Sequence, residues 1–153
     1  MAHGREGVVL AELLSNQIAP FSPQDPSRVS IAGPLVRLNT QAAQIMGMAA
    51  HELSTNAVKY GAFAGDNGHL SVHWALVEDR LDFVWRETVP HLLVLSDRTG
   101  FGTTVLKSMV GRSLGAAVER ICHDDGIEWQ FAIPLSALDP ARAPTKDTPD
   151  DAE

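Results

Sequence analysis

The feature that most constrains the fold of this sequence is a segment from residue 40 to residue 60 whose apolar residues recur at three- and four-residue steps. This spacing predicts a long amphipathic helix, and Asn39 or Thr40 can cap its N-terminus. Its apolar face is formed by Ala42, Ile45, Met46, Ala49, Leu53, Ala57 and Tyr60. A helix with one apolar face needs a second layer to cover that face, and the strand-like segments elsewhere in the chain can supply it.

The segments on either side of this helix have the periods of further helices and of paired strands. We expect helices over residues 8–18 and 101–113, short strands between residues 28 and 38, and β-hairpins over residues 70–85 and 116–133. Gly115 is placed to end the second of these helices. Because the late strands form antiparallel hairpins, we predict an α+β fold, a two-layer α/β sandwich in which a mixed sheet carries helices on one face.

Composition indicates one domain followed by a tail. The 153 residues are 44% hydrophobic, which is enough to build the core of a single domain. Residues 138–153 are rich in proline and acidic residues, a composition that cannot bury enough surface to order itself. We therefore expect a globular domain over residues 1–137 and a disordered acidic tail over residues 138–153.

Charge and cysteine content exclude several classes of protein. The formal net charge of −7 repels a phosphate backbone, so nucleic acid is not an expected partner. No apolar run approaches the roughly 18 residues of a membrane-spanning helix, and the N-terminus lacks the pattern of a secretory signal. We expect a cytoplasmic domain without membrane contact. Cys122 is the single cysteine, which excludes an internal disulfide and a thiolate zinc cluster.

The long helix also carries a polar stripe beside its apolar face. Glu52, Thr55, Asn56 and Lys59 lie at steps of three and four residues, so their side chains share one side of the helix. An amide oxygen and a few waters suit Mg²⁺, a lysine can neutralise phosphate charge, and a carboxylate can orient or deprotonate a nucleophile. A solvated helix face is the alternative interpretation, and spacing alone favours it.

Two further motifs strengthen the functional interpretation. Gly100-Phe101-Gly102-Thr103-Thr104 opens the second predicted helix, where unpaired amides and the helix dipole favour an anion. Trp85-Arg86-Glu87 ends a predicted strand, and Trp85 and Glu87 point to the same side of it. A carboxylate would then lie just beyond a buried aromatic ring at the edge of the core.

The motifs His-Glu-Leu-x-x-Asn-Ala-x-Lys-Tyr, Trp-x-Glu and Gly-Phe-Gly-Thr, in this order, resemble those of the ATP-binding catalytic domain of sensor histidine kinases. More narrowly, they resemble the HWE subfamily, which is named for its N-box histidine and its Trp-x-Glu motif. The resemblance runs from about Leu10 to Leu135. It implies the Bergerat ATP-binding sandwich of the GHKL ATPases, which include gyrase, Hsp90 and MutL.

The resemblance also implies a role for each matched residue. Glu52 would be the catalytic carboxylate, Asn56 the Mg²⁺ ligand and Glu87 the group that reads the adenine amino group. The segment from Thr88 to Gly100 would form the ATP lid. The remaining expected ATP-binding residues are His51, Lys59, Tyr60, Gly100, Phe101, Gly102 and Thr103.

The expected function is to bind Mg-ATP and to transfer its γ-phosphoryl group to a histidine on a separate dimerisation domain, which in turn serves a response regulator. Only one short helix precedes the predicted strands, so we expect the phosphoacceptor histidine to lie outside this chain. One departure favours an alternative, because Thr88-Val89-Pro90 stands where the subfamily usually has a glycine pair. The alternatives are a degenerate, kinase-like adaptor without nucleotide and a stand-alone serine kinase of the anti-sigma-factor type.

Overall fold

The computed structural model describes residues 7–90 and 100–140 and, in residues 100–104, the backbone alone. The described helices are α1 (Leu10–Ile18), α2 (Thr40–Tyr60) and α3 (Gly100–Leu114). The described strands are β1 (Val8–Val9), β2 (Val29–Ala32), β3 (Arg37–Leu38), β4 (His69–Val77), β5 (Arg80–Thr88), β6 (Ala117–His123) and β7 (Gly126–Pro134). The predicted elements are therefore present, and Gly115 directly follows α3. None of the described helices has both the length and the apolar composition that crossing a membrane requires.

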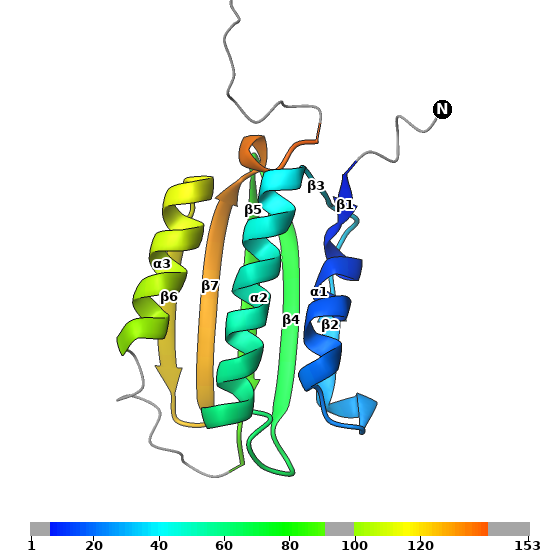
Figure 1. Cartoon of the computed structure of the whole chain (residues 1–153), viewed down its shortest axis with the longest axis vertical. Helices are drawn as coiled ribbons and strands as arrows, with labels where there is room; N and C mark the ends of the chain where they lie inside the picture. The colour runs from blue at the N-terminus through cyan, green and yellow to red at the C-terminus, as the bar shows by residue number, and fades with distance from the viewer. Residues whose placement is uncertain (1–6, 91–99, 141–153) are drawn as a thin grey trace, which may run out of the picture.

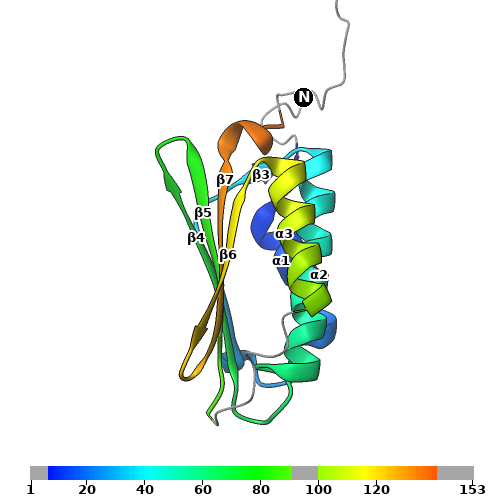
Figure 2. The same cartoon turned by 90° about the vertical axis from the view of Figure 1, so that its left-hand side faces the viewer.

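Five of these strands form one mixed sheet in the order β2-β4-β5-β7-β6. β2 runs parallel to β4, and the other neighbouring pairs are antiparallel. Helices α1, α2 and α3 lie side by side on one face of this sheet (Figures 1 and 2). The predicted two-layer α/β sandwich is confirmed. The two short strands between residues 28 and 38 do not pair with each other, because β3 pairs with β1 in a separate ribbon.

The core lies between the helices and the sheet. Alternate residues of β4, β5 and β7 point into it, as the period-2 patterns of the two hairpins predict. The rings of Phe83 and Phe131 meet edge to face with centroids 5.5 Å apart, and Trp74 stacks on Phe83 at 6.2 Å. On the opposite layer, α2 contributes several alanines, whose small side chains let the helix lie close to the aromatic side of the sheet.

Asn39 caps the start of α2 and also binds the backbone of residues 137 and 138 near the C-terminal end of the described chain. Its side-chain oxygen accepts a hydrogen bond from the amide of Ala42 at 2.8 Å, which confirms the predicted cap. Its Nδ2 donates to the carbonyl of Ala137 at 3.0 Å, and its backbone amide donates to the carbonyl of Leu138 at 2.8 Å. Leu138 is buried in the core. The packed domain thus continues past residue 137, where we expected the tail to begin, and residues 141–153 lie outside the described residues.

The difference in burial between the two sides of α2 leads to a prediction about stability. Leu53 is 1% exposed, whereas Val58, five residues later, is 41% exposed. We expect Leu53→Ala to lower the free energy of unfolding by about 2–5 kcal/mol, because it removes buried methyl groups and leaves a cavity. Val58→Ala is the matched control and should change it by less than about 0.5 kcal/mol. Denaturant unfolding followed by circular dichroism measures both, and equal effects would show that α2 is rotated differently.

Candidate functional site

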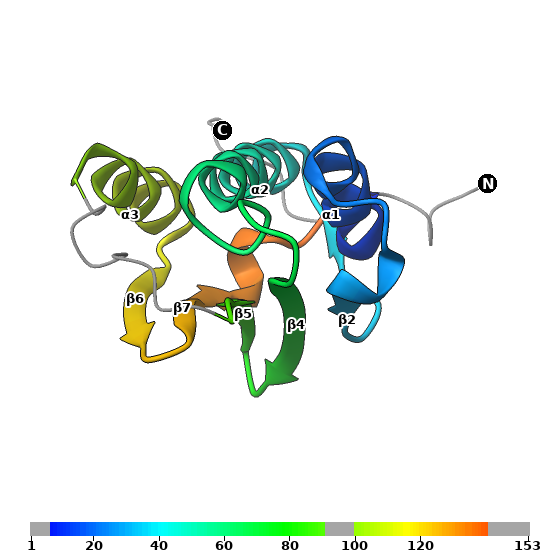
Figure 3. The same cartoon turned by 90° about the horizontal axis from the view of Figure 1, so that it is seen from below.

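A cavity of about 310 Å³ lies at the end of the sandwich where α2 and β5 both end. One wall is the loop between α2 and β4, and the other is the chain just after β5; Figure 3 views the molecule from this end. The lining residues are Gly61, Ala62, Ala64, Gly65, Asp66, Asn67, Gly68, Val89 and Pro90. This volume is at the lower end of the range of small-molecule pockets, about 300–1,000 Å³, so the cavity suits a base-sized group.

Glu87 lies directly behind the wall of this cavity. Its side chain is 3% exposed, and both carboxylate oxygens accept hydrogen bonds from the protein. Oε1 accepts from the backbone amide of Ala62 at 3.0 Å, and Oε2 accepts from the indole Nε1 of Trp85 at 2.9 Å. Burial raises the pKa of Glu87, and the two hydrogen bonds oppose this rise. The predicted position of a carboxylate just beyond a buried aromatic ring is therefore the observed one.

Gly61 is the residue that makes room for this carboxylate. It follows α2 directly, and a Cβ atom at this position would overlap Oε1 of Glu87. Any side chain at residue 61 would push the carboxylate away from the Ala62 amide or push the loop away from β5. The close approach of loop and strand thus depends on a glycine at the end of α2.

The polar stripe runs along α2 toward the helix end next to the cavity, but none of its residues lines the cavity. Glu52 and Asn56 are half-buried and one helical turn apart, and Lys59 is exposed in the last turn. Tyr60, the last residue of α2, is also exposed and precedes the first lining residue of the cavity. An acid, an amide and an amine are therefore arranged along one side of the helix, with the amine nearest to the cavity.

His51 lies apart from the other residues of the motif. Its ring contacts the edge of the Phe21 ring at a centroid distance of 5.3 Å, and it lines a groove between α1 and α2 together with Leu13 and Gln17. Asn56 is turned by about 140° from His51 around the helix axis. Asn56 therefore lies on the other side of the buried stripe from His51. Because α1 and α3 flank α2 on opposite sides, Asn56 is on the side of α2 that faces α3 (Figure 1).

The third motif is at the start of α3. Gly100, Phe101, Gly102 and Thr103 form its first turn, as expected, and α3 begins at the end of the molecule where α2 finishes (Figure 1). The side chains of these residues lie outside the description, and so do residues 91–99, which make up most of the expected ATP lid. The described part of that segment is Thr88, Val89 and Pro90, and the last two line the cavity.

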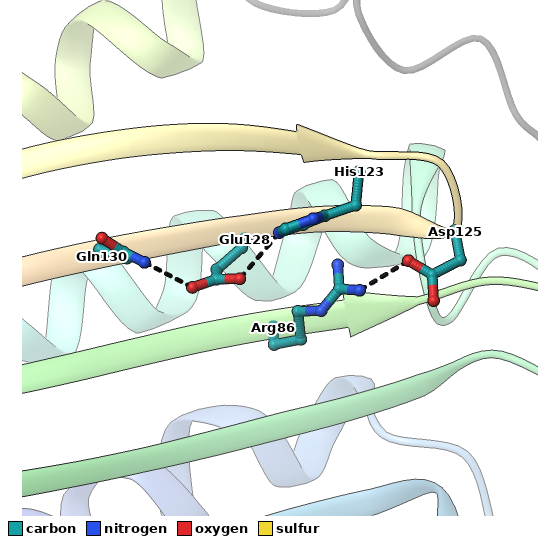
Figure 4. A network of polar contacts seen from close by, with 5 residues as sticks. All are labelled: Arg86, His123, Asp125, Glu128 and Gln130. Atoms are coloured by element: carbon teal, nitrogen blue, oxygen red, sulfur yellow. Dashed lines mark hydrogen bonds and ion pairs between the residues drawn. The ribbon is translucent and has the colours of Figure 1, made fainter.

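The turn between β6 and β7 supports the cavity from the side of the sheet. Asp125 accepts a hydrogen bond on its carbonyl from the amide of Val89 at 2.7 Å, and its carboxylate pairs with Nη2 of Arg86 at 2.6 Å. The hydrogen bond from Arg86 holds the pKa of Asp125 below its ordinary value. Beside this pair, Glu128 contacts both His123 and Gln130 (Figure 4). The start of the expected lid is thereby tied to a neighbouring hairpin.

Two contributors to the site were not evident from sequence. Arg28 donates hydrogen bonds to three carbonyls of the loop that lines the cavity, and Asp125 holds Val89. Both act through backbone groups that are distant in sequence, and no local pattern marks such contacts. Within the described residues there is no cluster of three or more His, Cys, Asp or Glu that could hold a metal ion.

The sequence is similar to histidine kinases. No family model matches it. It is 28% identical to blue-light-activated histidine kinase 1 of Erythrobacter litoralis over 86% of this chain and 37% of that protein. It is 29% identical to the blue-light-activated histidine kinase of Brucella ovis over 85% of this chain and 27% of that protein. The chain thus spans about a third or less of the length of these relatives.

Solved structures agree with these relatives. The blue-light-activated histidine kinase EL346 of Erythrobacter litoralis matches with a TM-score of 0.64 at 17% identity, over 83% of this chain and 41% of that chain. The catalytic domain of histidine kinase ThkA matches with a TM-score of 0.61 at 14% identity, over 86% of this chain and 97% of that domain. The chain has the fold of a histidine kinase catalytic domain. The resemblance to this kind of domain that the three motifs indicate is confirmed by both comparisons.

The buried carboxylate predicts a pH dependence of stability. Because the pKa of Glu87 is higher in the folded than in the unfolded chain, its contribution to the free energy of unfolding is fully present below the unfolded pKa. That contribution is lost as pH rises through the folded pKa. We therefore expect the stability of the parent to fall relative to Glu87→Gln as pH increases above about 4.3, the unperturbed value for glutamate.

Chemical denaturation at a series of pH values measures this difference. Glu119→Gln is the matched control for the loss of one carboxylate, because Glu119 is exposed on β6. A parent-minus-Glu87→Gln difference that stays constant from acid to neutral pH would contradict the assignment of Glu87 as the buried titrating group.

Proposed function

We propose that this domain binds Mg-ATP at the cavity and transfers the γ-phosphoryl group to a histidine of a separate dimerisation domain in the cytoplasm. The observation that carries the proposal is the position of Glu87 behind a base-sized cavity, next to the polar side of α2. The similarity to histidine kinases supports the reaction class.

The base of ATP would occupy the cavity. Glu87 lies behind the lining of the cavity, and each of its oxygens accepts one hydrogen bond from the protein and keeps a second lone-pair direction, through which it is proposed to accept from the amino group of adenine. Guanine has a carbonyl oxygen at the corresponding place, which the carboxylate would repel. The proposal therefore includes a preference for ATP over GTP.

The phosphates would lie between α2 and the start of α3. Asn56 offers an amide oxygen to Mg²⁺, which prefers oxygen ligands and keeps most of its waters, and this suits a site without a carboxylate cluster. Bound there, Mg²⁺ would neutralise the phosphate charge. Lys59 adds positive charge from the last turn of α2, and the amides of Gly100, Phe101 and Gly102 at the start of α3 favour the anionic end of the nucleotide.

Glu52 is proposed to act on the acceptor histidine. It lies one turn before Asn56, at the outer end of the stripe, where an incoming imidazole can approach. One ring nitrogen attacks the γ-phosphorus, the bond from that phosphorus to the leaving oxygen of ADP breaks, and Glu52 accepts the proton from the other ring nitrogen. A crystal structure of ThkA is a complex with the response regulator TrrA. By analogy, a response regulator would take the phosphoryl group from the acceptor here.

Titration of the purified chain with Mg-ATP by calorimetry tests the binding half of the proposal. We expect saturable binding, and we expect Asn56→Ala to abolish its dependence on Mg²⁺ while leaving the melting temperature near that of the parent, because Asn56 lies outside the core. Lys107→Ala on the exposed side of α3 is the control. Equal Mg²⁺ dependence in parent and Asn56→Ala would remove Asn56 as the ligand.

A second experiment tests phosphoryl transfer. The 153-residue chain incubated with labelled ATP and Mg²⁺ should not label itself, because none of its histidines belongs to a predicted helix hairpin that could present an acceptor nitrogen in line with the γ-phosphorus. Adding the dimerisation region of a cognate kinase should give acid-labile, base-stable phosphohistidine on that region, and Glu52→Gln should suppress it. Labelling of a histidine within this chain would show that the proposed division of roles is wrong.

A non-catalytic adaptor is the second candidate function. Val89 is buried and, with Pro90, forms part of the cavity wall, where the subfamily usually has glycines that leave more space. Absence of binding at millimolar Mg-ATP would favour the adaptor. An anti-sigma-factor-type serine kinase is less well supported, because the relatives and structures that match are histidine kinases.

A further inference from the structure

One arginine binds three carbonyl groups of the loop that lines the cavity. Nε of Arg28 donates to the carbonyl of Gly68 at 2.8 Å, and Nη2 donates to the carbonyls of Ala62 at 2.9 Å and Gly65 at 2.7 Å. All three acceptors belong to cavity-lining residues that lie 34 to 40 positions further along the chain. A single planar guanidinium thus holds both ends and the middle of this wall.

The elements on both sides of Arg28 hold it in place. Asp25 caps the 3₁₀ turn Pro26–Arg28 by accepting from the amide of Ser27 at 3.0 Å and from its hydroxyl at 2.7 Å. On the other side, Val29 begins β2 and pairs with Leu70 of β4. The guanidinium is therefore presented from two fixed elements to the chain that enters β4, and it needs little further ordering to bind the loop.

Ala62 connects this arginine to the buried carboxylate. Its carbonyl accepts from Arg28, and its amide donates to Oε1 of Glu87, so one buried residue is held from both sides. Glu87 is held in turn by the indole of Trp85. A continuous series of hydrogen bonds runs from Arg28 through Ala62 to Glu87, and a displacement of the loop would disturb the carboxylate.

The geometry points to Arg28 as a positioning residue of the nucleotide site: it sets the shape of the loop wall and, through Ala62, the placement of the Glu87 carboxylate that reads the base. The inference rests on the proposed function for the identity of the ligand. Arg28 does not line the cavity itself, so its effect on the nucleotide passes through the loop.

The contacts of Arg28 favour this role over a general contribution to stability. Arg28 is half-buried, and its three acceptors are loop carbonyls outside the strand ladders and helices. When the guanidinium is removed, the carbonyl of exposed Gly65 can turn to water and the carbonyls of buried Ala62 and Gly68 lose a partner, while the sheet and helices keep their own hydrogen bonds. The loop should therefore change before the fold does.

The experiment compares Arg28→Ala and Arg28→Lys with the parent by Mg-ATP calorimetry, with ATP-against-GTP competition and thermal unfolding alongside. Arg28→Ala should weaken ATP binding by about tenfold to a hundredfold and reduce the preference over GTP. Arg28→Lys should recover little, because an ammonium lacks the planar fork. The control is Arg80→Ala, whose exposed pair with Asp82 lies at the other end of β5, and it should bind as the parent does.

Chemical rescue separates positioning from a merely structural role. Millimolar ethylguanidinium should restore ATP binding to Arg28→Ala, ethylammonium should not, and neither should affect the parent. Hydrogen exchange without nucleotide should be faster at residues 62–68 in Arg28→Ala and unchanged in β4, β5 and β7.

The possible failures are distinguishable. A parent that does not bind Mg-ATP would overturn the proposed function, and unchanged exchange at residues 62–68 would overturn the loop contact itself. If the parent binds ATP and folded Arg28→Ala binds it equally well, the positioning role is wrong. A loss of affinity that ethylguanidinium does not restore, with a matching fall in melting temperature, would also overturn it.

Discussion

The buried carboxylate of Glu87 is the constraint on which the site end of the molecule depends. A carboxyl group on a residue that is 3% exposed is tolerated because its two oxygens accept from the Ala62 amide and the Trp85 indole. The bond from Ala62 requires the loop after α2 to lie against the end of β5, and Gly61 lacks the side chain that would prevent this approach. The cavity wall is thus a consequence of satisfying one carboxylate, and any change in the loop also changes the surroundings of that carboxylate.

Helix α2 combines structural and chemical roles because of its period. Leu53 and Ala57 bury one stripe against the sheet, and this packing fixes the rotation of the helix. Glu52 and Asn56, one position before each of these, are then necessarily presented on the side facing α3. The same rotation places His51 on the side facing α1, against Phe21. Packing of the core therefore decides which residues of one continuous motif reach the candidate nucleotide site.

Sequence patterns predicted the regular parts of the fold because those parts repeat locally. The period of α2, the Asn39 cap and the alternation in β4, β5 and β7 each depend on neighbours within a few residues. The motifs also allowed a candidate site to be predicted, because Glu87 and the polar stripe belong to such elements. The contacts of Arg28 with Ala62 and of Asp125 with Val89 use backbone groups that are distant in sequence, and a backbone carbonyl or amide carries no residue identity that a pattern could reveal. Leu138 was misplaced for a related reason: its packing depends on the distant Asn39.

The contacts around Val89 and Pro90 indicate what these two residues change relative to the glycine pair that is usual in the subfamily. Val89 donates its amide to Asp125 and buries its side chain, and Arg86 fixes Asp125 from the other side. Pro90 then restricts the backbone at the point where the chain leaves this support. The β6–β7 turn holds the start of the expected lid through the backbone amide of residue 89, which glycine would also supply. Val89 and Pro90 add a buried side chain and a fixed φ, which a glycine pair would lack. The cavity wall formed by Val89 and Pro90 is therefore more rigid and leaves less room than a glycine pair would. Nucleotide binding would then depend on how well this fixed cavity matches the base. Arg28 controls the opposite wall, and the two walls together define what the cavity can accept.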